Sequence, residues 1–259
     1  MQAAQMFSLK GRVALVTGAS SGLGQQFARA LADNSAAIVL VARRADRLKD
    51  FKAELEKSGA RAIAVEADVN DRAAMTAAFD AAEKAFGTVT ILVNNAGVAQ
   101  APVRAVELTE DEWRRVMSTN LEAVLFWAQE AAKRMLATGK KGAIVNIASV
   151  LGLGVSKGAV SYATSKAAVI QLTKALSLEW AFKGVRVNAI APGWFVTEIN
   201  DDYLNSDAGA AIKRDIPMGR FGNAGDLDGA LLLLVSDAGT YMTGATLVVD
   251  GGQVVQIRG

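Results

Sequence analysis

Short apolar runs alternate with longer helix-forming stretches along the whole chain, and this alternation restricts the fold more than any other feature. The runs are rich in Val, Ile and Leu and are continuous, which is typical of strands buried on both faces of a parallel sheet. Seven runs are predicted as strands: 13–16, 38–41, 62–65, 89–93, 143–148, 185–190 and 245–249. The sequence therefore predicts an α/β protein with a doubly wound, seven-stranded parallel sheet.

Length and composition agree with one large core. The chain has 259 residues, 51% of them hydrophobic, and no repeat or linker divides it, so residues 1–259 are predicted to form a single domain. The net charge is +2, and both signs are mixed along the chain, which disfavours nucleic-acid binding and a polybasic membrane anchor. No apolar run approaches the ~20 residues of a membrane span, and no signal peptide is recognisable. We expect a cytoplasmic protein.

A glycine-rich loop follows the first predicted strand directly. Gly18, Gly22 and Gly24 are spaced as G-x-x-x-G-x-G, and a helical pattern begins after them. A strand, a glycine loop and a helix N-terminus form the usual pyrophosphate cradle, because glycine lets the backbone approach the anion and the helix dipole favours it. The loop therefore predicts a dinucleotide site, with a glycine-rich turn that binds no ligand as the alternative.

Tyr162 and Lys166 are one helical turn apart, and Ser149 ends the apolar run that precedes them. Residues at this spacing share a helix face, so the lysine ammonium can reach the tyrosine hydroxyl. A cation beside a phenol draws its pKa down from about 10, which would make Tyr162 a usable proton donor and acceptor. The chain has no His and no Cys, so the commonest general base and the nucleophilic thiol are absent. An exposed Tyr and Lys on one helix face is the alternative.

Taken together, these motifs resemble the short-chain dehydrogenase/reductase family over nearly the whole chain. They occur in the family's order as residues 17–24 (TGASSGLG), Asp68-Val69, Asn94-Asn95-Ala96-Gly97, Asn120, Ser149, Tyr162 with Lys166, Asn188, and Pro192-Gly193 with Thr197. The resemblance implies a Rossmann-like fold with helices on both faces of the sheet. It also implies hydride transfer between a nicotinamide cofactor and a ketone or secondary alcohol, without a metal. The implied catalytic residues are Asn120, Ser149, Tyr162 and Lys166.

The resemblance also implies which residues hold the cofactor. Most follow the carboxyl ends of predicted strands, where ligands bind in open α/β sheets. They are Gly18, Ser20, Ser21, Gly22, Leu23, Gly24, Arg43, Arg44, Asp68, Val69, Asn95, Ala96, Gly97, Tyr162, Lys166, Pro192, Gly193, Phe195 and Thr197. Asn94, in contrast, is expected to tie neighbouring loops together.

The end of the second predicted strand bears on the choice of cofactor. It reads Ala42-Arg43-Arg44 and carries no carboxylate, which would accept from the ribose hydroxyls and repel a 2′-phosphate. Arg43 can form the charged fork that a phosphate prefers, so NADP(H) is favoured. NAD(H) stays open, because both arginines would also fit as solvated residues at a helix start.

The predicted substrate contacts are Ser149, Leu151, Tyr162 and Trp194, with a lid at about residues 194–220. The apolar walls, which would also include Val98, Val150, Val155 and Phe195, favour a hydrophobic ketone over a polyhydroxylated sugar. One alternative is a 3-oxoacyl-[acyl-carrier-protein] reductase that docks its carrier on Lys133, Arg134 and Lys174. Another is a nucleotide-binding scaffold without turnover, which the intact Ser149, Tyr162 and Lys166 argue against.

The helices expected at 111–137 and 161–182 carry apolar or small residues on more than one face, including Phe126, Trp127, Ala167, Ala168, Leu172 and Leu176. The family resemblance implies that these helices pair between subunits and that a second interface uses the last strand. We therefore expect a homotetramer.

Overall fold

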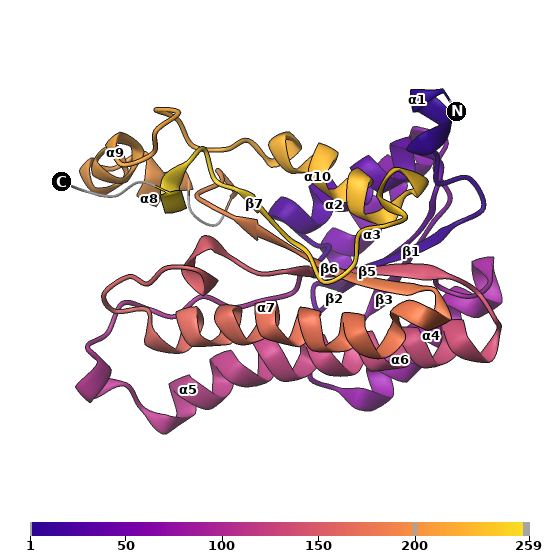
Figure 1. Ribbon diagram of the computed structural model, residues 1–259, viewed down its shortest axis with the longest axis horizontal. Helices are drawn as coiled ribbons and strands as arrows, with labels where there is room; N and C mark the ends of the chain where they lie inside the picture. Colours follow the sequence, from indigo (N-terminus) through magenta and orange to yellow (C-terminus); the bar gives the residue numbers. More distant parts are fainter. Residues whose placement is uncertain (1, 199–200, 256–259) are drawn as a thin grey trace.

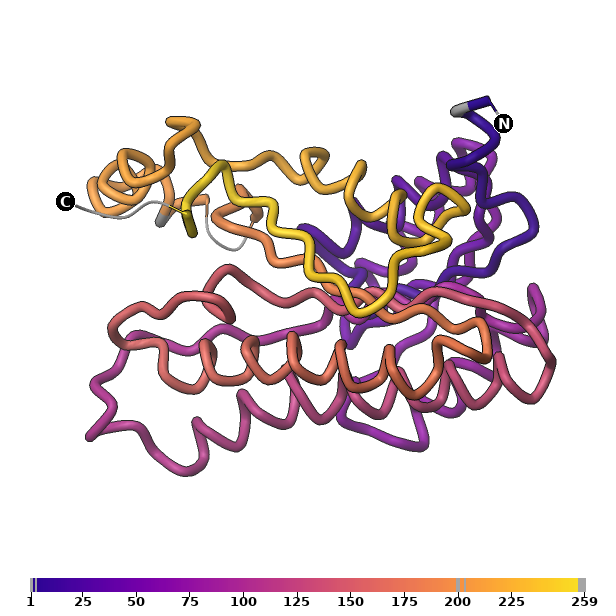
Figure 2. The backbone as a smooth tube through the Cα atoms, viewed as in Figure 1, coloured from indigo at the N-terminus to yellow at the C-terminus, as the bar shows by residue number. Residues whose placement is uncertain are grey.

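The structure is a computed structural model that describes residues 2–198 and 201–255 (Figures 1 and 2). Seven parallel strands form one sheet in the order β3-β2-β1-β4-β5-β6-β7. Their bounds are β1 Val13–Thr17, β2 Ala37–Ala42, β3 Ala62–Glu66, β4 Ile91–Asn94, β5 Gly142–Ile147, β6 Val185–Pro192 and β7 Thr246–Val249. The predicted fold class and all seven strands are confirmed, although β4 begins two residues later than expected.

Helices cover both faces of the sheet (Figure 1). One layer holds α2, α3 and α10, and the other holds α4 to α7. The helix bounds are α1 Ala3–Met6, α2 Gly22–Asp33, α3 Ala45–Lys57, α4 Arg72–Phe86, α5 Glu110–Met117, α6 Ala123–Ala137, α7 Val160–Trp180, α8 Asp201–Leu204, α9 Asp207–Arg214 and α10 Asp228–Val235. The short helices α8 and α9 lie at the end of the molecule opposite the N-terminus, above the loops that precede α5 and α7 (Figures 1 and 2).

The core consists of two apolar layers, one on each face of the sheet. Phe27 and Leu234 belong to the first layer, and Phe79, Trp127 and Leu176 to the second. Trp127 is 1% exposed and Leu176 is 8% exposed. The expectation that these two residues serve a subunit interface is wrong, because their side chains are already buried against the sheet of their own chain.

Capping side chains set the helix starts. Asp71 accepts from the backbone N–H groups of Ala73 and Ala74 at the start of α4, and Thr109 accepts from Glu112 N at the predicted start of α5. Helices α5 and α6 are joined by a π-helical turn, Ser118–Glu122, so that the three segments form one long helix. Such turns bulge a helix locally and often occur at functional sites.

A chain of buried amides and one hydroxyl links β4, β5 and α7. Asn94 Nδ2 donates to Asn146 Oδ1 (2.9 Å), and Asn146 Nδ2 donates to Thr173 Oγ1 (3.0 Å). Asn188 has a similar role on β6, where it donates to Met242 O and accepts from Ala245 N. The expected structural role of Asn94 matches these contacts, which hold the middle strands and α7 together under the site.

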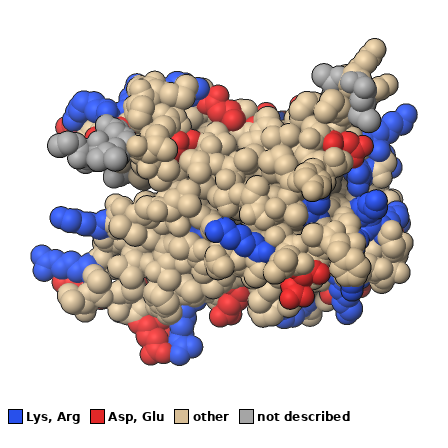
Figure 3. Space-filling model, viewed as in Figure 1, with Lys and Arg blue, Asp and Glu red and all other residues tan. Residues whose placement is uncertain are grey.

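The surface is mixed in charge on the face seen in Figure 3, where basic and acidic side chains are interspersed. Among the residues that the structure describes, no helix is both long and apolar enough to cross a membrane.

Candidate active site

The glycine loop connects β1 to the N-terminus of α2 at the carboxyl edge of the sheet. Gly18 and Gly22 have φ of 68° and 54°, values that favour glycine. A β-carbon on Gly24 would lie 2.2 Å from the carbonyl oxygen of Gly18, so a larger residue would separate the helix from the loop. The N-cap side chain, Ser21, is turned toward Arg44 and leaves the first-turn N–H groups of α2 available. This cradle fits a pyrophosphate, whose oxygens accept from such N–H groups.

Two arginines follow β2, and they are placed differently. Arg44 donates to Ser20 Oγ through Nε (3.1 Å) and Nη2 (2.9 Å), and Nη2 also donates to Ser21 Oγ (2.7 Å). Arg43 has a side chain that is 72% exposed, and its Nη1 lies 3.9 Å from Asp68 Oδ2. Arg44 therefore lies along the glycine loop, which is closer to the cradle than Arg43, the arginine that the sequence favours as the phosphate ligand.

The Asn95 side chain holds the start of the glycine loop through hydrogen bonds. Its Nδ2 donates to Thr17 O (2.9 Å) and Gly18 O (3.4 Å), and the backbone N–H groups of Asn95 and Ala96 both donate to Thr17 Oγ1. The Asn95 side chain is thus turned into the protein rather than toward a bound ligand. Its contribution to the cradle is the shape of the loop.

Asp68 and Val69 follow β3 on the same edge of the sheet. Asp68 Oδ1 accepts from the backbone and side-chain nitrogens of Asn70, which makes a local turn. Val69 O accepts from the indole Nε1 of Trp127 (2.9 Å). These contacts fix the two residues beside the loop, with Asp68 Oδ2 still facing Arg43.

Ser149, Tyr162 and Lys166 converge where β5 ends and α7 begins. Ser149 is 8% exposed and Lys166 is 4% exposed. Ser149 Oγ accepts from Leu151 N (3.1 Å), and the Ser149 side chain is close enough to the Tyr162 hydroxyl to affect its pKa. Lys166 Nζ lies 5.7 Å from the centroid of the Tyr162 ring and donates to Ile147 O (2.8 Å). The sequence prediction that these three residues share one site is consistent with this geometry.

The prediction that the pKa of Tyr162 is lowered is wrong for the protein without a bound cofactor. Burial raises the pKa of Tyr162 above its ordinary value of 10.0, and the hydrogen bond from Ser149 lowers it by a smaller amount. Burial also lowers the pKa of Lys166 from 10.5 to about 8. The lysine is desolvated and donates to a backbone carbonyl, so it remains mostly charged at neutral pH but loses its proton more readily than an exposed lysine.

Asn120 occupies the π-helical turn between α5 and α6 and is fully buried. Its Oδ1 accepts from Val98 N (2.8 Å), and its Nδ2 donates to Val98 O (3.0 Å) and to Ser165 Oγ (3.3 Å). A β-carbon on Gly97 would lie 3.3 Å from Asn120 Oδ1 and 3.7 Å from Lys166 Nζ. Asn120 and Lys166 therefore both lie beside Gly97.

The loop after β6 leads from the site into the predicted lid. Gly193 lies against Asp250, because a β-carbon there would be 2.8 Å from the Asp250 Cα atom. Phe195 is 5% exposed, and its ring covers Gly222, whereas Thr197 lies 3.4 Å from the position of a β-carbon on Gly22. The segment thus crosses from β6 to the glycine loop. The predicted lid includes residues 199 and 200, which lie outside the described residues.

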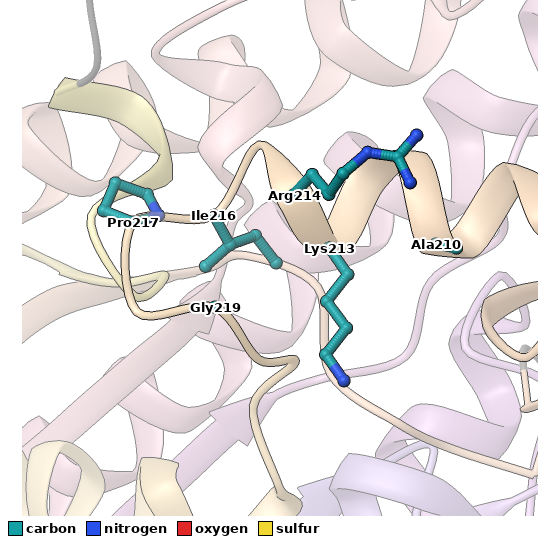
Figure 4. A pocket seen from close by; sticks show the side chains of 6 residues that line it. All are labelled: Ala210, Lys213, Arg214, Ile216, Pro217 and Gly219. Atoms are coloured by element: carbon teal, nitrogen blue, oxygen red, sulfur yellow. The ribbon is translucent and has the colours of Figure 1, made fainter.

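A cleft of ≈ 780 Å³ lies within the lid and is lined by Ala210, Lys213, Arg214, Ile216, Pro217 and Gly219 (Figure 4). The side chains of Lys213 and Arg214 leave α9 in different directions (Figure 4). The predicted catalytic residues do not line this cleft, so it marks the lid and not the reacting centre. Of the predicted walls, Val150 is 6% exposed and contributes to the core, whereas Val155 is 89% exposed.

Sequence reasoning missed two residues that shape the site. A β-carbon on Gly152 would lie 2.7 Å from the backbone C and O atoms of Lys166, so only glycine lets the Ser149 loop contact α7. Gln100, which is 8% exposed, accepts from the start of α7. Local sequence gives no signal for either residue, because both act through contacts between distant segments.

Known proteins match nearly the whole chain. The family described as short chain dehydrogenase matches residues 12–208. Galactitol 2-dehydrogenase (L-tagatose-forming) from Cereibacter sphaeroides is 44% identical over 253 residues, which cover 96% of this chain and 98% of that protein.

Solved structures show the same fold. A putative 2-deoxy-D-gluconate 3-dehydrogenase from Agrobacterium tumefaciens with bound NADP is 43% identical with a TM-score of 0.89, over 97% of this chain and 99% of that one. A gluconate 5-dehydrogenase from Burkholderia cenocepacia in complex with NADP and tartrate is 36% identical with a TM-score of 0.93, over 99% and 100%. Each of these names refers to a polyol or a sugar acid.

Proposed function

We propose a role for each site residue, a preferred cofactor and a substrate class for this chain, which belongs to the short-chain dehydrogenase/reductase family. Members of the family are NAD(P)-dependent oxidoreductases, and this chain acts on alcohols or ketones. The observation that carries the proposal is the convergence of Ser149, Tyr162 and Lys166 beside Gly97, in the loop after β4 that packs against Gly18.

Tyr162 is the general acid and base. The bound nicotinamide supplies or removes a hydride at the substrate carbon. In the direction of reduction, the Tyr162 hydroxyl gives its proton to the substrate oxygen, and in the direction of oxidation it takes a proton from the alcohol. Ser149 donates a hydrogen bond to the same oxygen and so orients it. Burial keeps Tyr162 protonated at neutral pH, which suits a proton donor.

Lys166 and Asn120 support Tyr162 from the other side. Lys166 would hold the ribose next to the nicotinamide when the cofactor is bound, and its ammonium would also stabilise the tyrosinate. Asn120 lies within reach of the same space by Gly97 and would hold a water molecule that returns the proton. General acid catalysis of this kind contributes about 10²- to 10⁴-fold to the rate.

NADP(H) is the preferred cofactor. Arg44 lies on the hydroxyls of Ser20 and Ser21, and Arg43 lies close by at the strand end, so two guanidinium groups flank the place where a 2′-phosphate would follow the glycine loop. The strand itself ends in Ala42, which offers no carboxylate to the ribose. Two structural relatives with bound NADP agree with this choice.

The substrate is a small polyhydroxylated alcohol or hydroxy acid and its ketone. The relatives named above act on a polyol or on sugar acids, according to their names. Lys213 lines the lid cleft and forms no ion pair with any described residue, so a cation is available to a substrate carboxylate. The alternative acyl-carrier-protein substrate finds less support, because Arg134 is occupied by Asp80, Glu83 and Glu130.

The lid at 194–220 would close over such a substrate, and the active form would be a homotetramer. Leu178 and Phe182 are 85% and 86% exposed at the end of α7, and Tyr241 is fully exposed near the edge strand β7. These apolar groups would be covered by neighbouring subunits, one patch for each of two interfaces.

One experiment tests the proposed function. NADP+ and NAD+ are each supplied with galactitol, gluconate and a hydrophobic secondary alcohol, and reduction is followed by absorbance in wild type and in Tyr162→Phe. We expect NADP+-dependent turnover with a polyol or sugar acid, and a loss of about 10²- to 10⁴-fold in kcat in the variant with cofactor binding retained. Full activity of Tyr162→Phe would contradict the assignment.

A further inference from the structure

Helix α7 begins without a capping side chain of its own. Its N-cap residue is Ala159, whose methyl group cannot accept a hydrogen bond. The N–H groups of the first turn have no partner inside the helix, and an N-cap side chain normally accepts from the second or third of them. Tyr162 occupies the third position, in the turn that frays most readily.

Gln100 takes the place of the missing cap from a distant segment. Its Oε1 accepts from Ser161 N (2.8 Å), Ser161 Oγ (2.5 Å) and Tyr162 N (3.3 Å). Its Nε2 donates to Gly158 O (2.9 Å) in the turn just before the helix. The side-chain amide is 8% exposed, and both ends are engaged, so its orientation is fixed.

The segment that carries Gln100 is itself part of the site. It follows the loop at Gly97, which lies beside Asn120 and Lys166. A second contact joins the same segments, since Val103 N donates to Gly158 O (3.3 Å). The loop after β4 and the first turn of α7 are therefore held as one unit.

We infer that Gln100 is a positioning residue for the reaction, which caps α7 from the β4 loop and thereby holds Tyr162 in line with Ser149. Lys166 lies one turn further along and has its own bond to Ile147 O, so it does not depend on this cap. Loss of the cap displaces Tyr162 and leaves the lysine and the cofactor cradle in place. The inference rests on the proposed role of Tyr162.

Three variants test the inference in the full-length protein. Gln100→Leu keeps the size and removes both the acceptor and the donor. Gln100→Glu keeps the acceptor, adds charge and removes the donor to Gly158 O. Gln5→Leu is a matched change on the exposed helix α1 at the other end of the molecule (Figure 1). The measurements are kcat and its pH profile, the Kd of NADPH from fluorescence, and Tm.

We expect Gln100→Leu to lower kcat by about 10- to 100-fold, because small misplacement of a catalytic group is costly, while the Kd of NADPH changes by less than about twofold. Gln100→Glu should keep more of the kcat and move the tyrosine limb of the pH profile to higher pH, because a nearby carboxylate disfavours the tyrosinate. Gln5→Leu should match wild type in all measurements.

Several outcomes would overturn the inference. Wild-type kcat in Gln100→Leu is one, and a parallel loss of kcat, NADPH binding and Tm is another, because it would mean a structural role only. If Gln100→Leu does not fold, Gln100→Glu decides alone, and an unshifted pH profile rejects the inference. A fully active Tyr162→Phe would reject the proposed function, whereas an inactive Tyr162→Phe with a fully active Gln100→Leu would reject only the role of Gln100.

Discussion

The two arginines after β2 allow a test of how the chain selects its cofactor. Sequence alone ranked Arg43 first, but the structure places Arg44 on the glycine loop through three hydrogen bonds to two serine hydroxyls. A guanidinium that is already oriented loses less side-chain entropy when a phosphate binds. The Arg43 side chain is 72% exposed, and Asp68, at 3.9 Å, is the acidic partner that the described residues offer it. We therefore expect Arg44 to contribute more to the recognition of a 2′-phosphate.

The magnitudes follow from burial and geometry. A hydrogen bond to a charged group contributes about 1.5–3 kcal/mol, and Arg44 is exposed to solvent, so the lower part of that range applies. Arg44→Ala should weaken NADPH binding by about 1.5–2 kcal/mol, or about 10- to 30-fold. An exposed ion pair contributes about 0.2–1 kcal/mol, so Arg43→Ala should weaken it by at most about fivefold. NADH binding should change little in either variant.

The assay is fluorescence titration of NADPH and NADH, combined with kcat/KM for both cofactors at two salt concentrations. Lys49→Ala, an exposed change on α3, is the control for loss of positive charge. Ala42→Asp should move the preference toward NAD(H), since its carboxylate would repel the phosphate and accept from the ribose. Equal losses for both cofactors in Arg44→Ala, or a larger effect of Arg43→Ala, would refute the reasoning.

Three further outcomes are expected. Burial lowers the pKa of Lys166 from 10.5 to about 8, so the unfolded chain binds more protons than the folded chain between these pH values. The free energy of unfolding of the cofactor-free protein should therefore rise by about 2–3 kcal/mol from pH 8 to 10. Urea unfolding of Lys166→Met should show no such rise. Lys213→Ala should raise KM for gluconate about fivefold and leave KM for galactitol unchanged, whereas Arg214→Ala should change neither in steady-state assays. Leu178→Asp should shift the particle to a smaller size in light scattering if that face is an interface, and a wild type that is already monomeric at micromolar concentration would contradict the tetramer.

The sequence determined the architecture and the identity of the reacting groups. Buried parallel strands must be continuously apolar, so the seven runs were readable without any knowledge of their neighbours in the sheet. The spacing of Tyr162 and Lys166 and the glycines of the loop are likewise local features, because one helical turn or one tight turn sets them.

Only the tertiary structure decided features that depend on pairs of distant residues. The contact of Arg44 with Ser20 and Ser21 requires β2 to lie beside β1, and the capping of α7 by Gln100 requires the β4 loop to meet the helix. The direction of the Tyr162 pKa shift also belongs here, since desolvation depends on everything that packs around the hydroxyl and sequence spacing shows only one neighbour. Periodicity reports which face of an element is buried, and it carries no information about which remote polar group will be found there.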